Sequence, residues 1–300
     1  MRSALNRLYD SPLALLLGTG ALLGLNFPFG KLAMAEAIAP SLWALVISLG
    51  AGLALLIIAK VSEPPPERTT GLARFAIISG FISYVMPNLL IFTVIPKIGS
   101  GMAGIMFALS PVATAMLSLL LNVRPPNRFG VLGISLGLLG AALIVWGKSR
   151  GAGQGVSLWL LLALAVPLFL AVGNVYRSLA WPKGVGPKML GSLTNLASVP
   201  FLIAIALVLG DSLNPSVLMR TPILVLAQLA ASTATFTMFF RLQQIGGPTY
   251  LSQIGYVAAA VSLFIGVGFF GEYYPAAVWI GAAIIVVGIG LTTYSTRRPE

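Results

Sequence analysis

The chain has 300 residues, of which 58% are hydrophobic and only 8% are charged. Soluble domains carry roughly 25% charged residues, so this composition excludes a soluble globular protein and indicates an integral membrane protein. The net charge of +11 would suit a nucleic-acid partner, while the absence of Cys and His excludes disulfides and removes the commonest metal ligand and the usual acid–base group at neutral pH.

Hydrophobic segments recur along the whole chain, each about 20 residues long and therefore able to cross roughly 30 Å of hydrocarbon as a helix. Clusters of turn-forming residues, such as EPPPERTTG, RPPNR and GAGQG, separate them. The sequence therefore predicts an all-α membrane protein with ten transmembrane helices. In chain order the predicted spans are 12–32, 41–60, 71–93, 99–121, 128–148, 157–178, 187–209, 218–240, 247–269 and 275–295.

The first predicted span ends in the stretch NFPFGK, which collects residues that a membrane helix usually avoids. Pro28 has no backbone N–H and clashes with the preceding turn, and Gly30 is a weak helix former. Asn26 carries an amide that hydrocarbon cannot solvate. Because irregular backbone at membrane depth is tolerated only against protein or water, we expect a helix break beside a polar, gated site here.

The sixth span repeats this pattern at an offset of 148 residues, with Asn174 in the place of Asn26. Pro167 lies about two turns before Asn174 and predicts a second helix break. The same offset relates glycines of the fifth and tenth spans, pairing Gly133 with Gly281 and Gly140 with Gly288.

The nearly constant offset indicates two copies of one five-helix unit, at residues 12–148 and 157–295. Because five is an odd number, the second copy must enter the membrane inverted relative to the first. Inverted repeats with a substrate site at their interface are a recurrent transporter architecture. The predicted fold is therefore two inverted five-helix repeats around a central cavity.

Further polar residues recur at helical spacing and give candidates for the lining of that cavity. Lipid offers such side chains no partner, so they are expected to face inward. The candidates, besides Asn26 and Asn174, are Tyr84 and Asn88 in the third span, Met106 and Ser110 in the fourth, and Gln253 and Tyr256 in the ninth. The alternative, bonding between neighbouring helices, is favoured for Ser232 and Thr114 and stays open for the two Asn residues.

The distribution of basic residues predicts the orientation. The span ends that share a side with the N-terminus carry 13 of the 18 Lys and Arg residues, and the opposite ends carry the other five, which are Lys31, Lys97, Lys148, Arg150 and Arg220. By the positive-inside rule, both termini are cytoplasmic, with Arg124 inside and Glu272 outside. The basic excess is thus explained by the bilayer, and we expect no nucleic-acid partner.

Three stretches carry a resemblance to a known family: NFPFGK at 26–31, GIMFALSPV at 104–112, and FFGEYYP at 269–275. With the tandem five-span repeat, the whole chain resembles the drug/metabolite transporter superfamily, specifically its EamA-type exporters. The resemblance implies a bundle whose central cavity is lined mainly by spans 1, 3, 4, 6, 8 and 9. It also implies outward movement of small organic metabolites, often amino acids, across the cytoplasmic (inner) membrane.

The acidic residues bear on the mechanism, because all seven fall in predicted loops, termini or span ends. Ion-coupled transporters commonly keep a carboxylate or His near the midplane. We therefore expect facilitated diffusion or exchange by alternating access, while Na⁺ held by backbone carbonyls stays open. Charges near the mouths, at Lys31, Arg74, Lys97 and Arg177, favour neutral or zwitterionic solutes.

Other readings stay open as alternatives. A multidrug or sugar/nucleotide-type transporter would share the fold. A membrane-embedded enzyme would need a nucleophile, an acid–base pair or a metal, and without His, Cys or a buried carboxylate we expect no catalytic residue, metal or cofactor. A structural membrane protein would not need paired helix breaks. The Gly-rich fifth and tenth spans favour packing inside a monomer, with a homodimer left open.

Overall fold

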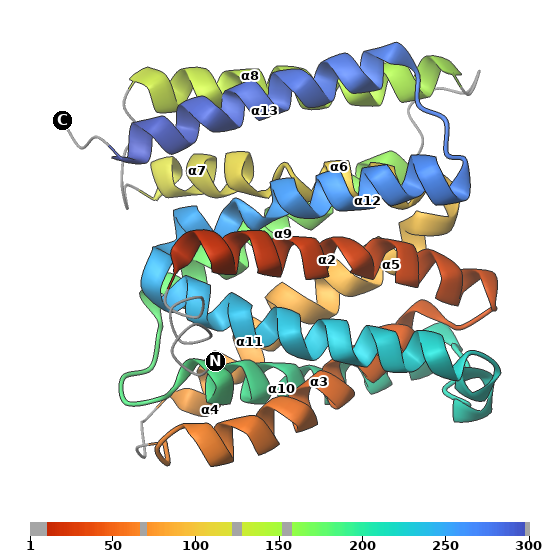
Figure 1. Ribbon diagram of the computed structural model, residues 1–300, viewed down its shortest axis with the longest axis vertical. Helices are drawn as coiled ribbons and strands as arrows, with labels where there is room; N and C mark the ends of the chain where they lie inside the picture. The colour runs from red at the N-terminus through yellow and green to blue at the C-terminus, as the bar shows by residue number, and fades with distance from the viewer. Residues whose placement is uncertain (1–10, 67–70, 122–127, 152–157, 298–300) are drawn as a thin grey trace.

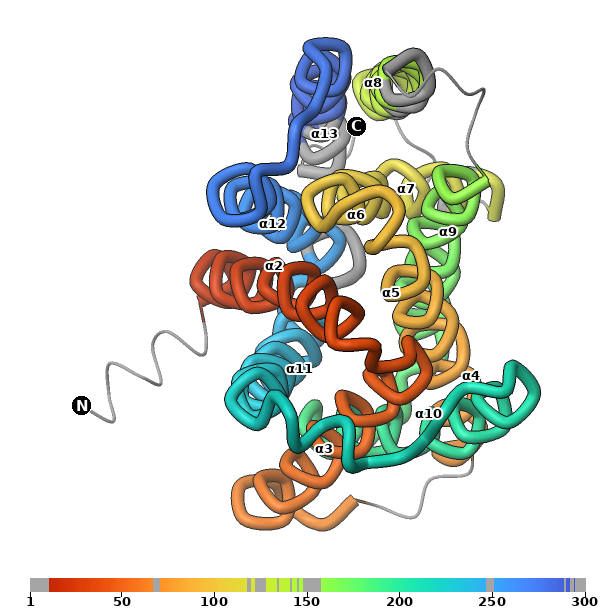
Figure 2. Tube along the Cα trace, turned by 90° about the vertical axis from the view of Figure 1, so that its right-hand side faces the viewer, coloured from red at the N-terminus to blue at the C-terminus, as the bar shows by residue number. Residues whose placement is uncertain are grey.

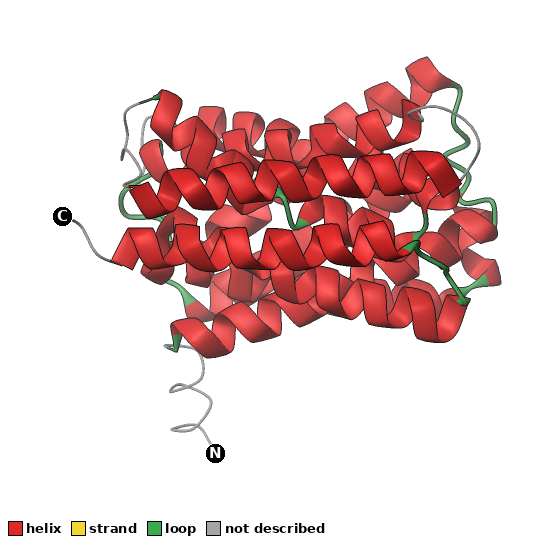
Figure 3. Ribbon diagram, turned by 90° about the horizontal axis from the view of Figure 1, so that it is seen from above, coloured by secondary structure: helices red, strands yellow, loops and turns green. Residues whose placement is uncertain are grey.

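The computed structural model describes residues 11–66, 71–121, 128–151 and 158–297, and within these ranges the chain is helical without a strand. The helices lie side by side in one bundle (Figures 1 and 3). We call the end of the bundle at which the first described helix begins the near end, and the opposite end the far end. The prediction of an all-α membrane protein is confirmed.

The helices of the first half of the chain are α2 (Pro12–Ala35), α3 (Pro40–Ser62), α4 (Leu72–Gly80), the π-helix η1 (Phe81–Val85), α5 (Met86–Ile98), α6 (Ser100–Phe107), α7 (Ser110–Leu120) and α8 (Arg128–Gly151). Those of the second half are α9 (Leu158–Leu179), α10 (Pro187–Leu209), the 3₁₀ helix η2 (Pro215–Arg220), α11 (Pro222–Ser252), α12 (Ile254–Phe270) and α13 (Ala276–Arg297). Each of the ten predicted spans falls on these helices. Seven described helical segments are long and apolar enough to cross a membrane.

Helix starts and stops follow local chemistry. α2 begins with Ser11, whose hydroxyl accepts a hydrogen bond from the Ala14 amide, and with Pro12 in the first turn, where no N–H is needed. α10 and α12 end at Gly210 and Gly271, whose φ angles of 70° and 60° suit glycine.

Two predicted helix breaks are wrong. α2 continues through Pro28 and α9 continues through Pro167 without interruption. Two other prolines instead coincide with irregular helical backbone, at the π-helix η1 and at the end of α6. A proline ring clashes with the carbonyl four residues earlier. Four residues before Pro87 is Ser83, at the centre of the π-turn, and four residues before Pro111 is Phe107, where α6 ends.

One predicted boundary also differs. The sequence placed the turn between the eighth and ninth spans at 246–248, but helical backbone continues to Ser252, and α12 begins after Gln253. Spans four and nine are therefore each built from two consecutive helical pieces, the first divided at residues 108–109 and the second at Gln253.

Packing of the fifth and tenth spans supports the inverted repeat. α8 and α13 run antiparallel at one edge of the bundle (Figures 1 and 2) and touch backbone to backbone. A Cβ atom at Gly140 would lie 2.6 Å from the Gly281 carbonyl, and one at Gly288 would lie 2.6 Å from the Gly133 carbonyl. Because Gly133 corresponds to Gly281 and Gly140 to Gly288, a two-fold rotation exchanges the two contacts.

The second and seventh spans are related in the same way at the opposite edge of the bundle. Glu63, after α3, accepts hydrogen bonds from the first-turn amides of α10, at 2.8 Å from Lys188 and 2.9 Å from Met189. Asp211, which is 148 residues further on and follows α10, accepts a bond of 2.5 Å from the hydroxyl of Ser41 in the first turn of α3. Each acidic residue thus stabilises the positive end of the partner helix's dipole.

The predicted orientation can be tested with two exposed positions. Lys183 lies in the near-end connection between α9 and α10, and Tyr273 lies in the far-end connection before α13, with 84% of its surface exposed. Because the chain has no native Cys, we expect impermeant maleimide on intact cells to label Tyr273→Cys but not Lys183→Cys until the membrane is permeabilised. The reverse pattern would contradict the orientation. The sequence also predicted that Arg124 lies on the cytoplasmic side, but Arg124 is outside the described residues.

Candidate functional site

Arg177 lies at the centre of a polar cluster inside the bundle. The sequence placed this residue at a span end near a mouth. It does lie in the last turn of α9, but it is 0% exposed, so the expectation that its charge faces a mouth is wrong. Side chains on a helix point toward its N-terminus, and Arg177 accordingly reaches back one turn, where Nη2 donates to Oδ1 of Asn174 over 2.7 Å. The guanidinium therefore turns into the protein rather than toward the near-end surface.

Two further elements complete the surroundings of Arg177. Its Nε donates over 2.8 Å to Oε1 of Gln243 on α11, and Nη1 donates to the hydroxyl of Ser83 in η1. The ring of Phe239 lies 5.2 Å from the guanidinium carbon, which is within cation–π range. All these neighbours are uncharged, and among the described residues no carboxylate forms an ion pair with Arg177.

The π-turn explains how the third span contributes to this cluster. π-bulges occur often at functional sites, because the extra residue in a turn redirects the side chains around it. Here the turn brings Ser83 to Arg177 and buries the adjacent Tyr84 against Phe236, with ring centroids 5.0 Å apart. The Tyr84 hydroxyl is buried and has no hydrogen-bond partner within the part of the chain that the structure describes.

The two Asn residues related by the repeat both make contacts between helices. Nε2 of Gln228 on α11 donates to Oδ1 of Asn26 and, over 2.6 Å, to the hydroxyl of Ser232. Nδ2 of Asn174 approaches the Thr114 hydroxyl at 3.4 Å. The first Asn is partly exposed and the second is 4% exposed. These bonds match the interhelical alternative for both residues, and a role in binding stays a prediction.

The remaining candidates are distributed over the interior. Met106 and Ser110 are buried on either side of the break between α6 and α7, and Asn88 is half-buried on α5. Gln253 lies at the start of α12. Tyr256, on α12, has a buried hydroxyl to which no described residue is hydrogen-bonded. Of the predicted residues, the structure brings Tyr84 and Asn174 to Arg177 and leaves the others elsewhere along the helices.

Pro28 and Gly30 have a packing role in the structure. Both are buried inside continuous α2, and a Cβ atom at Gly30 would lie 2.7 Å from the ring of Phe92 on α5. Gly30 therefore allows the first and third spans to approach closely. Gating by these residues and by Pro167 stays a prediction.

Sequence reasoning missed Arg177, Ser83 and Gln243 as members of the cluster. A signal for Arg177 was present, since it lies three residues after Asn174 and so one turn along the same helix face. Gln243 carried no comparable signal, because it was assigned to a loop beyond the eighth span. Among the described residues no group of three His, Cys, Asp or Glu side chains could hold a metal ion.

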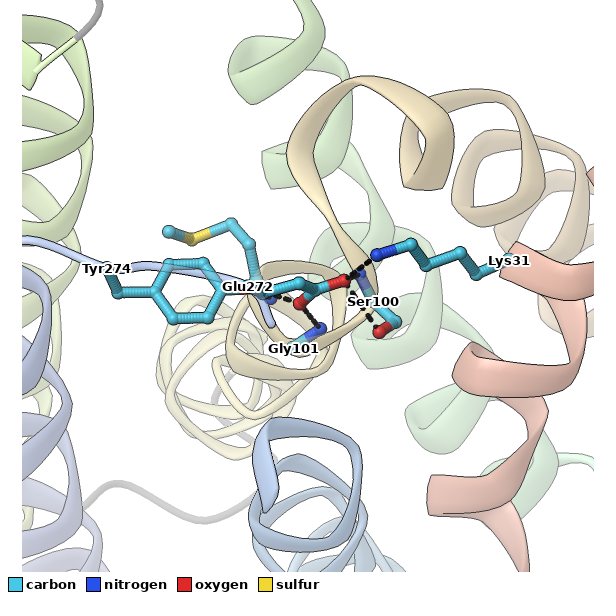
Figure 4. Close-up of polar contacts among 6 residues, drawn as sticks. Lys31, Ser100, Gly101, Glu272 and Tyr274 are labelled. Atoms are coloured by element: carbon cyan, nitrogen blue, oxygen red, sulfur yellow. Dashed lines mark hydrogen bonds and ion pairs between the residues drawn. The ribbon is translucent and has the colours of Figure 1, made fainter. Parts of the chain in front are cut away.

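A second polar cluster, the Glu272 cluster, lies at the far end of the bundle (Figure 4). The Glu272 carboxylate pairs with Nζ of Lys31 at 2.6 Å and accepts bonds from the amides of Ser100 at 2.8 Å and Gly101 at 3.0 Å. The Tyr274 hydroxyl donates to the same carboxylate. One side chain thus ties α2 to the first turn of α6 and to the α12–α13 connection, where a carboxylate also suits the helix dipole.

This cluster predicts a pH-dependent stability. Burial alone would raise the pKa of the Glu272 carboxyl, but the hydrogen bonds from Lys31, Tyr274 and the amides of Gly101 and Ser100 lower that pKa from 4.5 to about 2. A lowered pKa contributes stability above about pH 4.5, and the contribution is lost as the pH falls toward 2.

We therefore expect the gap in thermal midpoint between the wild type and Glu272→Gln to be constant above about pH 5 and to shrink on acidification. Thermal unfolding of the detergent-purified protein across this range measures the gap. Glu36→Gln, which removes an exposed carboxylate at the same end, is the control. A gap that widens as the pH falls would contradict the assignment.

An apolar groove of about 680 Å³ between α3 and α11 is an unsuitable site for a polar solute. Its lining includes Gly50, Ile58 and Leu229, and the hydroxyl of Thr237 is already bonded to the Thr233 carbonyl over 2.7 Å. Apart from Thr233 and Thr237 its lining is apolar, whereas the cluster around Arg177 gathers several polar side chains.

Comparisons with known proteins agree with this architecture. The EamA-like transporter family matches the chain twice, at residues 11–146 and 157–294. A solved structure described as "Crystal structure of protein" aligns with a TM-score of 0.64 and 19% sequence identity, covering 94% of this chain and 97% of that one. At that identity the likeness concerns the fold alone. No curated protein matches the sequence.

Proposed function

We propose a substrate and a mechanism for this chain, which belongs to the EamA-like transporter family and is therefore a membrane transporter of the drug/metabolite transporter superfamily. The proposed function is the outward movement of small organic metabolites, amino acids first among them, across the cytoplasmic membrane. The proposed mechanism is alternating access, in which the two repeats rock about a site between them.

The observation that supports this proposal best is the unsatisfied polar surface inside the bundle. The hydroxyls of Tyr84 and Tyr256 and Nε2 of Gln243 are buried and have no hydrogen-bond partner among the described residues. An unpaired buried polar group costs about 1–3 kcal/mol, so native proteins keep few of them without a reason. A transported solute with several polar groups would supply the missing partners. We therefore assign the pathway to the space between α2, the η1–α5 segment, α9, α11 and α12.

The candidates from the sequence are proposed to line this pathway: Asn26, Tyr84, Asn88, Met106, Ser110, Asn174, Gln253 and Tyr256. The interrupted helices of spans three, four and nine are proposed to bend as the repeats move. Helix interruptions absorb changes in φ and ψ more cheaply than continuous helix does. The Glu272 cluster would then hold the far end shut until the solute is released there.

Transport by the purified protein in liposomes tests the function. We expect counterflow of at least one member of a panel of L-amino acids, with sugars as the comparison for the alternative substrate class. Because the described residues place no carboxylate near the middle of a span, collapsing the proton or sodium gradient should leave the rate unchanged within about twofold.

Two outcomes would contradict this proposal in different ways. Accumulation that appears only when a gradient is imposed would exclude facilitated diffusion and exchange. Counterflow of sugars without any amino acid would replace the substrate class and leave the transporter itself intact. Empty liposomes and liposomes with heat-denatured protein supply the background rate.

A further inference from the structure

The charge of Arg177 lacks a counter-ion in the described part of the chain. The guanidinium is 0% exposed and bonded to Ser83, Asn174 and Gln243, all of which are neutral. A buried charge that is hydrogen-bonded but unpaired is costly, and arginine remains protonated in proteins. Near a helix end in a membrane, an arginine whose charge served only solubility would extend to the interface instead.

The geometry leaves this guanidinium able to bind an anion. A guanidinium has five N–H donors, and the bonds of Arg177 to Gln243, Ser83 and Asn174 use one donor at each nitrogen. Two donors therefore remain with respect to the described residues. The Tyr84 hydroxyl and Gln243 Nε2 have no hydrogen-bond partner in the described part of the chain. Tyr84 follows Ser83, which is bonded to Arg177, and the Gln243 side chain is itself bonded to Arg177. Together these groups supply several hydrogen-bond donors close to one another. Such a set of donors suits a carboxylate that is held by paired charge-assisted hydrogen bonds.

We propose that Arg177 is the anchor for a carboxylate group of the transported solute, with Tyr84 and Gln243 as additional donors. This inference rests on the proposed transport function and narrows it to solutes that carry a carboxylate. Ser83 and Asn174 act as positioning residues, because they hold the planar fork of the guanidinium in one orientation.

The two repeats place different residues at corresponding positions, so the proposed site carries a positive charge on one side only. Subtracting the offset of 148 from 177 gives Phe29, so the first repeat has an aromatic ring where the second has a cation. Asn26 in turn contacts the neutral Gln228, whereas its counterpart Asn174 contacts Arg177. A solute with a carboxylate at one end and a neutral or apolar group at the other matches this asymmetry, and a symmetric dication does not.

Four variants separate binding from a structural role. Arg177→Gln removes the charge, and Arg177→Lys keeps the charge but loses the paired geometry. Gln243→Glu places a carboxylate beside Arg177 Nε, so an internal ion pair would preserve the fold while occupying the anchor. Tyr84→Phe removes a hydroxyl that bonds to none of the described residues, so it should not lower stability. Arg220→Gln, at an exposed residue of η2, is the control for net charge.

The measurement is counterflow in proteoliposomes with matched probes: L-phenylalanine with L-phenylalaninamide, and phenylacetate with phenylacetamide, beside a panel of L-amino acids and glucose. We expect the wild type and Arg220→Gln to prefer each acid over its amide. We expect acid transport per folded molecule to fall about ten- to hundredfold in Arg177→Gln and Gln243→Glu, and less in Arg177→Lys and Tyr84→Phe. Thermal midpoints of Gln243→Glu and Tyr84→Phe should stay near that of the wild type.

The outcomes separate this inference from the function on which it rests. If the wild type transports amides or glucose as well as acids, or if Gln243→Glu and Tyr84→Phe keep full acid transport, the anchor is overturned and the transporter stands. If the folded wild type transports none of the probes, both the carboxylate anchor and the proposed transport function are overturned. If Arg177→Gln does not fold, acid transport by Gln243→Glu and Tyr84→Phe decides whether Arg177 anchors the carboxylate.

Discussion

Replacing Asn26 by Leu is expected to lower transport per folded molecule by more than about tenfold while the protein still inserts and folds. Leucine fills a similar volume but neither donates nor accepts a hydrogen bond. Gln228 Nε2 has two N–H donors, of which one would keep its bond of 2.6 Å to Ser232 and the other would lose Asn26. The structural cost should therefore be that of one interhelical hydrogen bond, about 0.6–2 kcal/mol, and a larger loss of transport than this cost explains would support Asn26 in the pathway.

Asn174→Leu tests the symmetric position and should cost more. This Asn contacts both Arg177 and Thr114, so its loss leaves a guanidinium donor without a partner. We expect loss of transport together with a lower thermal midpoint, because the unpaired donor on a charged group is expensive to bury.

Asn195→Leu is the matched control for both variants. Asn195 is a fully buried Asn on α10, where its amide bonds to the Gly191 carbonyl over 2.8 Å and its Cβ packs beside Gly52 on α3. If Asn26 and Asn174 served only helix packing, all three variants would lose about 0.6–2 kcal/mol of stability and keep transport. Equal transport by Asn26→Leu and the wild type would remove Asn26 from the proposed site.

Replacing Gly281 by Leu is expected to prevent folding. A Cβ atom at this position would lie 2.7 Å from the Gly140 carbonyl and 2.7 Å from the side chain of Ile144, both on α8. Backbone cannot yield as a flexible side chain does, so the two helices would have to separate along their whole contact. Overpacking of a tight core typically costs 1–3 kcal/mol, and a clash with backbone should exceed about 3 kcal/mol.

The yield of monodisperse protein in size-exclusion chromatography and its thermal midpoint measure this effect. Gly290→Leu is the control on the same helix, since a Cβ atom at Gly290 has no atom within 4 Å. Leucine there should be neutral or stabilising, because it is a better helix former than glycine by about 1 kcal/mol. Wild-type folding of Gly281→Leu would contradict the backbone contact between α8 and α13.

Much of the fold could be predicted because membrane insertion imposes strong local constraints. Span lengths follow from bilayer thickness and from the need to satisfy every backbone group inside a helix. Most predicted boundaries fell within a few residues of the helices, as at 41–60 against Pro40–Ser62 and at 187–209 against Pro187–Leu209. The resemblance to EamA-type transporters is confirmed by the family match over both halves.

Helix breaks were predicted less well, because a proline has two outcomes that local sequence does not distinguish. Pro28 and Pro167 lie within continuous helices, whereas Pro87 and Pro111 coincide with a π-turn and a break. The difference depends on what packs against the weakened turn. Around Pro28, close neighbours such as Phe92 and Val261 hold α2 in place through Gly30 and Gly24.

The sequence by itself determined the class of this protein, its helices and its repeat, since hydrophobic length, helix-capping residues and an internal offset are local or additive properties. Only the tertiary structure decided which polar residues meet. Ser83 and Gln243 are far apart in the sequence, and both contact Arg177 because of how the helices pack and which face of its helix each residue occupies. Neither property is encoded at short range. From the sequence, an arginine near a span end is expected to lie at the membrane interface. In the structure Arg177 is buried, so its charge lies inside the bundle.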